Sequence, residues 1–95
     1  MDNFEPVPIK LKNNYILIQD IKNETITKSG IYIPDDTYNR FSRVIAVSDD
    51  DMSGLKPGDL IIKPIGKESK IKLNGHVYGC IRSNLIFAKI IDDGE

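Results

Sequence analysis

The sequence has few of the residues on which covalent or metal chemistry depends. Its 95 residues contain one cysteine, one histidine and no tryptophan. The single cysteine, Cys80, excludes an internal disulfide and fits a reducing compartment, so we expect a cytoplasmic protein. The same scarcity excludes a zinc site built from histidine and cysteine ligands. A phosphate-binding glycine loop is also missing, so we expect no cofactor.

An excess of positive charge and a long apolar run are missing as well. Thirteen lysines and arginines stand against fourteen acids, a formal net charge of -1, so we expect no nucleic-acid partner. No apolar run approaches the roughly 20 residues that span a bilayer, and the first residues lack the basic and apolar regions of a signal peptide. We therefore expect no membrane partner and no cleaved leader.

Candidates for catalysis are equally scarce. His76 and Cys80 are the one possible base and nucleophile, and on one strand they would lie about 13 Å apart along the backbone, well beyond the roughly 3 Å that such a pair needs. We interpret them as a strand histidine and a small packed thiol. The sequence therefore predicts a protein that is not an enzyme.

Residues 49–54 match the opening of a calcium-binding loop. Two observations argue against calcium: Leu60 occupies the position of the bidentate glutamate, and the flanking segments are strand-like rather than helical. We interpret this acidic stretch as a solvated turn between two strands.

Short apolar runs separated by turn-forming residues are what the chain does contain. No window of a dozen residues shows the 3.6-residue period of an amphipathic helix, so the sequence predicts one all-β domain over residues 1–95. A chain of this length buries only about 60 to 65% of its unfolded surface, so an oligomer would help its core. The predicted strands cover residues 15–21, 43–48, 59–64, 70–73, 76–81 and 86–91.

One hairpin has a strong local signal. The pair Asn74-Gly75 separates two strand-like runs, and a type I′ turn needs positive φ at both of its central positions, which this pair tolerates best. The turn sets the register and places Leu73 opposite His76.

Both ends of the chain have the pattern of a subunit interface. Pro6 and Pro8 remove amide donors from one edge of an extended segment only, so the other edge can still pair. Residues 86–91 are apolar on both faces, which requires a second covering surface. The predicted interface residues are Val7, Ile9, Leu11, Ile86, Phe87, Ala88 and Ile90.

A long polar segment, residues 22–42, contains one apolar tripeptide, Ile31 to Ile33. Two interpretations remain open. The tripeptide could be a seventh core strand flanked by ordinary loops, or it could lie in a loop whose polar composition stays unfolded until a partner supplies the burial.

The order of these features resembles the GroES family, the ten-kilodalton co-chaperonins that cap GroEL-type chaperonins. The runs that carry the resemblance are "LKNNYILIQDI", "SGIYIP", "RVIAVS", "LKPGDLII" and "SNLIFAKI", and together they span nearly the whole chain. The resemblance implies a small irregular β-barrel that assembles as a homo-oligomer, a seven-membered ring. In such rings the N-terminal strand pairs with the C-terminal strand of a neighbour.

The resemblance also implies that the apolar tripeptide is an anchor, which lies outside the core and is buried by the chaperonin. Residues 22–42 would form the mobile loop through which the ring binds its chaperonin and assists ATP-dependent folding. One departure is that only residues 48–55 remain where ordinary members carry a roof hairpin, and this trimming resembles bacteriophage-encoded members. The chaperonin-binding residues implied by the resemblance are Gly30, Ile31, Tyr32, Ile33 and Pro34.

An alternative interpretation stays open at this point. The chain could be an SH3-like or OB-like barrel that binds nucleic acid or another protein through a basic groove with aromatic platforms. Tyr78 is the one aromatic residue near the candidate groove. The lysines that would line it are Lys56, Lys63, Lys67, Lys70 and Lys72.

Overall fold

The computed structural model describes residues 8–21, 30–34 and 38–91. Within these ranges there is no α-helix, and one turn of 3-10 helix, η1 (Ser83–Leu85), precedes the last strand. The predicted all-β class is confirmed. The strands are β1 (Tyr15–Asp20), β2 (Asn39–Val47), β3 (Leu60–Pro64), β4 (Ser69–Leu73), β5 (His76–Arg82) and β6 (Ala88–Lys89).

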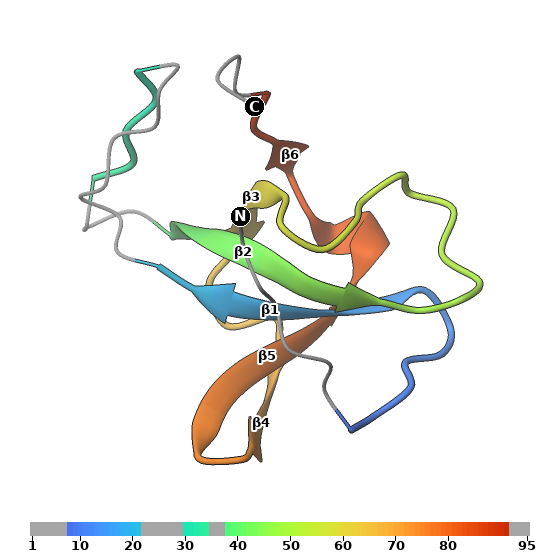
Figure 1. The fold of residues 1–95 in the computed structure, drawn as a ribbon. Coiled ribbons are helices and arrows are strands. Elements are labelled where there is room, and N and C mark those ends of the chain that lie inside the picture. The colour runs from blue at the N-terminus through green and yellow to red at the C-terminus, as the bar shows by residue number, and fades with distance from the viewer. Residues whose placement is uncertain (1–7, 22–29, 35–37, 92–95) are drawn as a thin grey trace.

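The six strands form one antiparallel sheet in the order β4-β5-β1-β2-β3-β6. Figure 1 shows β1 and β2 crossing the middle of the molecule, with the β4–β5 hairpin on one side of them and β6 on the other. A bulge between Leu17 and Ile18 interrupts the β1–β2 register. Because a bulge increases the local twist of a strand pair, it helps the sheet to curl into a barrel-like shape.

Alternate residues of the central strands pack into two hydrophobic clusters. In β3, Ile61 joins one cluster while its neighbours Leu60 and Ile62 pack against the other, as the two-residue period of a strand requires. The first cluster consists of Ile16, Ile18, Val44, Ile61 and Ile81. The second cluster consists of Ile33, Phe41 and Ile90, with the partly buried Ile21, Leu60 and Ile62 packed against it.

The predicted Asn74-Gly75 turn is confirmed, and a second turn before β3 depends on a glycine in the same way. Asn74 and Gly75 have φ values of 52° and 84° and join β4 to β5, with Leu73 opposite His76. Gly58, which follows a proline in the turn before β3, has a φ of 97°, and its amide donates to the carbonyl of Val44 at 2.8 Å. Both turns thus occur where glycine or asparagine supplies a backbone conformation that other residues reach only with strain.

Two predicted strand limits are wrong. Strand β2 begins at Asn39, four residues before the predicted start, so residues 39–42 of the polar segment pair with β3. Phe41 explains the difference, because its side chain is fully buried in the second cluster. The predicted strand over residues 86–91 is reduced to β6, which pairs with only two residues of β3.

Candidate functional site

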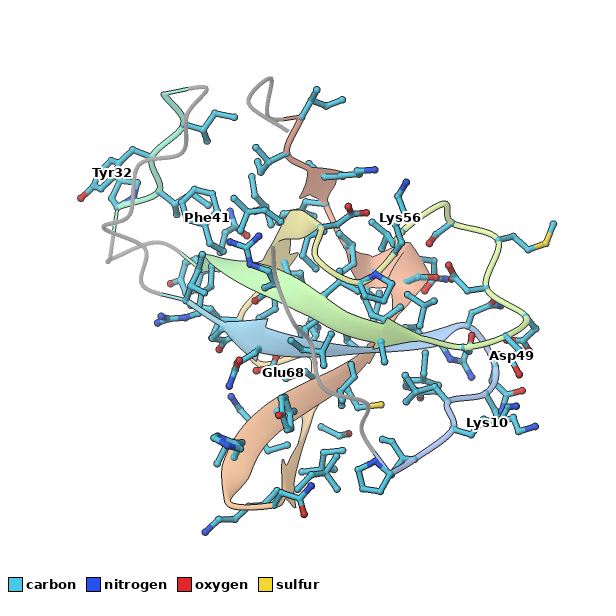
Figure 2. All side chains as sticks on the ribbon, viewed as in Figure 1. Lys10, Tyr32, Phe41, Asp49, Lys56 and Glu68 are labelled. Carbon is cyan, nitrogen blue, oxygen red and sulfur yellow. The ribbon has the colours of Figure 1, made fainter. Side chains whose placement is uncertain are left out.

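Residues 30–34, the described part of the polar segment before β2, belong to no strand. Gly30 has a φ of 85°, so any other residue would be strained there although there is open space for a side chain. The next two side chains, Ile31 and Tyr32, are 37% and 50% exposed. Figure 2 shows Tyr32 pointing away from the sheet, near the start of β2. This pair offers apolar surface for contact with a partner.

The anchor interpretation expected Ile33 to lie outside the core, and this expectation is wrong. Only 8% of Ile33 is exposed, and it packs in the second cluster with Phe41 and Ile90. The competing expectation of a core strand is also wrong, because residues 30–34 form no strand. The cause is that Phe41 and Ile90 leave an apolar site next to the sheet, and one isoleucine of the tripeptide fills it without strand pairing.

The predicted interface residues are distributed between the interior and the surface. Val7 lies outside the described residues. Leu11 and Ile90 are buried, and Ile86 packs against the first cluster. Ile9 and Phe87 are 36% and 61% exposed, and Ala88 is also exposed. Since β6 is the last strand in the sheet order, its second edge is not paired within the described sheet.

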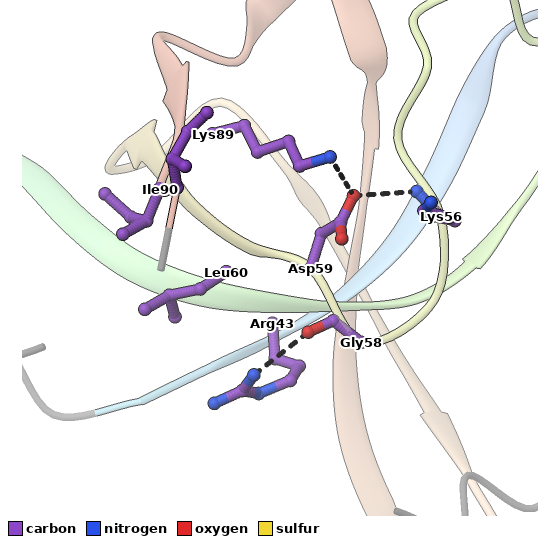
Figure 3. A pocket seen from close by; sticks show the side chains of 8 residues that line it. Arg43, Lys56, Gly58, Asp59, Leu60, Lys89 and Ile90 are labelled. Carbon is purple, nitrogen blue, oxygen red and sulfur yellow. Dashed lines mark hydrogen bonds and ion pairs between the residues drawn. The ribbon is translucent and has the colours of Figure 1, made fainter. Parts of the chain in front are cut away.

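A pocket of about 390 Å³ adjoins this edge (Figure 3). Nζ of Lys89 lies 3.3 Å from Oδ2 of Asp59, which also accepts the backbone amide of Lys56 at 3.0 Å. The guanidinium of Arg43 donates to the carbonyl of Gly58 at 3.0 Å. Three cationic side chains against one carboxylate leave the pocket with an excess of positive charge, and its apolar lining is Leu60, Ile90 and Ile91.

An ion network joins the end of β1 to the start of β2. Asp20 ends β1 and Arg40 lies at the start of β2, with Nε of Arg40 3.9 Å from Oδ2 of Asp20. The Lys63 side chain is 1% exposed, and its Nζ lies 3.2 Å from Oδ1 of Asp20 and 2.9 Å from Oε2 of Glu68. Ser42 donates its hydroxyl to Asp20 at 2.8 Å. The network fixes the strand ends between which the polar segment is attached.

This network was not predicted from the sequence. A signal was present, because Lys63 stands two residues after Ile61 in β3 and alternation places both on the same face. A lysine on a core face is rarely buried without a paired acid. Asp20 could not be named as a partner, since it lies far away in the sequence, whereas Glu68 stands close to Lys63 in the chain.

The short connection of residues 48–55 is tied back to the start of β1. The carboxylate of Asp50 accepts the backbone amides of Asn13 and Asn14 at 3.2 and 3.1 Å and the Ser48 hydroxyl at 2.7 Å. The Ser48 and Asn14 hydrogen bonds are the main reasons why the pKa of Asp50 lies below its ordinary value. Asp50 therefore holds a turn in which both asparagines have positive φ.

The residues that the sequence offered for catalysis, metal binding or nucleic-acid binding do not form such sites in the described structure. The His76 ring packs near that of Tyr78, with centroids 6.3 Å apart, and burial raises the pKa of the Cys80 thiol. No group of three or more potential metal ligands occurs within the described ranges. Lys63, one of the lysines proposed to line a basic groove, is buried, so it is not available to a nucleic-acid backbone.

Comparisons with known proteins bear on the resemblance. The family model of the chaperonin 10 kDa subunit matches residues 8–90, and this confirms the resemblance drawn from the sequence. The comparison with curated proteins gives no match. No helix in the described part of the chain is long and apolar enough to cross a membrane.

Proposed function

The chain belongs to the chaperonin 10 kDa subunit family, which implies a co-chaperonin rather than an enzyme, and we propose that it caps a GroEL-type chaperonin through residues 30–34. The observation that carries the proposal is the exposed pair Ile31 and Tyr32, presented beside the sheet immediately after Gly30. Capping of this kind assists the ATP-dependent folding of client proteins. The nucleotide belongs to the chaperonin.

The energetics favour many weak contacts over one strong contact. Full burial of an exposed apolar side chain gains roughly 1.5 to 3 kcal/mol, while fixing a loop residue costs about 1 to 2 kcal/mol. Ile31 and Tyr32 gain less than this on a partner, because they are already partly buried. A single subunit therefore binds weakly. Useful affinity comes from several subunits that engage one partner ring together, because later contacts form at a high effective concentration.

The family implies an oligomeric ring, and the heptamer is our proposal for its size. We propose that the first residues of one subunit, including Val7 and Ile9, pair with the open edge of β6 in its neighbour. The unpaired edge of β6, the exposed Phe87 and the adjacent pocket support this arrangement. A head-to-tail contact closes into a ring when its rotation closes, and then the outer edge of β6 is paired in every subunit.

Two further assignments belong to the proposal. Residues from about 22 to the start of β2 serve as the mobile loop, which folds on the chaperonin. The short connection of residues 48–55 replaces a roof hairpin, as in bacteriophage-type members, and leaves an open orifice at the top of a ring. We also propose a cytoplasmic location, where a GroEL-type partner would be met.

Native mass spectrometry tests the proposal directly. The protein is measured alone and then with a GroEL-type chaperonin in the presence of nucleotide. We expect a heptamer alone and a complex of one heptamer per chaperonin ring with nucleotide. A monomer that forms no complex at any nucleotide state would contradict both the assembly and the capping function, whereas a ring of another size would contradict only the heptamer.

A further inference from the structure

Ile33 occupies a place in the second cluster although its backbone belongs to no strand. Its exposed fraction of 8% sets it apart from Ile31 and Tyr32 beside it. We propose that the second cluster is an intramolecular binding site for Ile33, which competes with the chaperonin for this side chain. The inference rests on the proposed function, because that function assigns residues 30–34 to chaperonin binding.

The rest of the second cluster is held in place without Ile33. Phe41 is fully buried and stands opposite Ile62 in the β2–β3 register. The amide of Ile90 donates to the carbonyl of Leu60 at 2.8 Å. These positions are fixed by sheet pairing, so Ile33 can leave without separating any pair of strands. When Ile33 leaves, an apolar site remains whose residues are still held in place by sheet pairing.

The geometry makes the two binding events exclusive for this side chain. Ile33 cannot be buried against Phe41 and against a chaperonin at the same time. Ile31 and Tyr32, in contrast, present exposed surface while Ile33 is docked. A chaperonin can therefore contact the exposed pair first and gain Ile33 only when it leaves the second cluster. The apparent affinity is the intrinsic affinity multiplied by the fraction of subunits in which Ile33 is released.

The competition can be tested by weakening the second cluster at a residue outside both predicted binding surfaces. Ile21 packs against the second cluster and belongs neither to the chaperonin-binding set nor to the ring interface. The variant Ile21→Ala is compared with Ile71→Ala, the same change at a partly buried position in β4, at the far end of the sheet. Ile62→Val supplies a milder change in case Ile21→Ala does not fold.

Two measurements are made on the full chain. The first is the nuclear Overhauser effect between the Ile33 methyl groups and the Phe41 ring, free and in complex with a GroEL-type chaperonin. We expect this signal in the free wild type, a weaker signal in Ile21→Ala, and none in the complex. The second is chaperonin affinity, which we expect to rise about threefold or more in Ile21→Ala relative to Ile71→Ala, because more subunits have Ile33 released.

Each contrary outcome has a distinct meaning. Absence of the signal in free wild type would overturn the intramolecular site while leaving capping intact. Persistence of the signal in the complex, or an unchanged affinity when the signal is weakened, would overturn the competition. If the wild type showed the signal but bound no chaperonin, the proposed function would fail and the competition with it, while the site for Ile33 would stand.

Discussion

Nζ of Lys63 lies 2.9 Å from Oε2 of Glu68, and the two side chains are 1% and 4% exposed. Taking two charges out of water costs free energy that their mutual attraction only partly returns. Removing one partner is more costly still, because the other charge is left buried without compensation. The pair therefore makes stability depend on the ionised state of Glu68.

Acid should weaken the protein through this pair. Burial raises the pKa of Glu68, but its interactions with Lys63, its own backbone amide and Lys70 outweigh that effect, so the pKa lies below its ordinary value. A carboxylate whose pKa is lower in the folded state contributes stability that is fully present above the unfolded pKa of about 4.3. That contribution is lost as the pH falls through the folded pKa.

We therefore expect Glu68→Gln to lower the free energy of unfolding by about 3 kcal/mol at pH 7 and to flatten its decline below pH ~4.3. Urea unfolding between pH 3 and pH 7 measures both effects. The control is Lys70→Gln, since the Lys70 side chain is 59% exposed and its ion pairs should contribute little. If the free energy of unfolding falls as steeply with acid in Glu68→Gln as in the wild type, other carboxylates are responsible for most of the acid sensitivity.

Gly79 is the position that makes room for Glu68. A Cβ at residue 79 would lie 2.8 Å from Cγ of Glu68 and 3.4 Å from Cγ1 of Ile18. Moving Glu68 aside would disturb its buried ion pair with Lys63, so we expect Gly79→Ala to destabilise the protein by about 1 to 3 kcal/mol. In a Glu68→Ala background the same change should cost less. Equal costs in the two backgrounds, measured by chemical unfolding, would show that Glu68 is not the obstacle.

Local features were predictable from the sequence, and long-range packing was not. The Asn74-Gly75 turn depends on the φ preferences of its own two residues, so a short stretch was enough to predict it. Ile33 and Phe41 have no such local pattern. Their burial depends on Ile90, which lies more than forty residues further along the chain, and nothing in the spacing of the polar segment indicates that contact.

Asp50 should matter more for stability than its neighbour Asp49. Its carboxylate satisfies two backbone amides in the turn of Asn13 and Asn14, whereas Asp49 makes an exposed ion pair with Lys10. We expect Asp50→Ala to lower the thermal unfolding midpoint and Asp49→Ala to leave it nearly unchanged. Because the pKa of Asp50 lies below its ordinary value, its contribution should be present near neutral pH and lost in acid.

Equal midpoints for the two alanine variants would contradict this assignment. The amides of Asn13 and Asn14 provide a second readout, since their hydrogen exchange should accelerate in Asp50→Ala and remain slow in Asp49→Ala.

Deleting residues 1–9 should convert the proposed ring to monomers. The reason is that the open edge of β6 would lose the segment that we propose to pair with it, while the described sheet would keep all its strands. Analytical ultracentrifugation measures the assembly, and circular dichroism checks that the fold persists. A deletion variant that still sediments as a ring would show that the interface is built elsewhere, for example around Phe87 and the neighbouring pocket alone.

The two isoleucines of the tripeptide should respond differently to the same substitution. Ile31 is 37% exposed, so Ile31→Ser should leave the free energy of unfolding nearly unchanged. Ile33 is buried in the second cluster, so Ile33→Ser should cost about 2 kcal/mol or more, as large-to-small changes in a core do.

Both serine variants should reduce capping of a GroEL-type chaperonin. A modest loss of binding free energy at each subunit is multiplied when several subunits bind one chaperonin together, so even Ile31→Ser should abolish assisted refolding. Urea unfolding and a refolding assay on the same samples separate the two effects. A folded Ile31→Ser ring that still caps normally would place the chaperonin contact outside residues 30–34, and equal stability of the two serine variants would contradict the burial of Ile33.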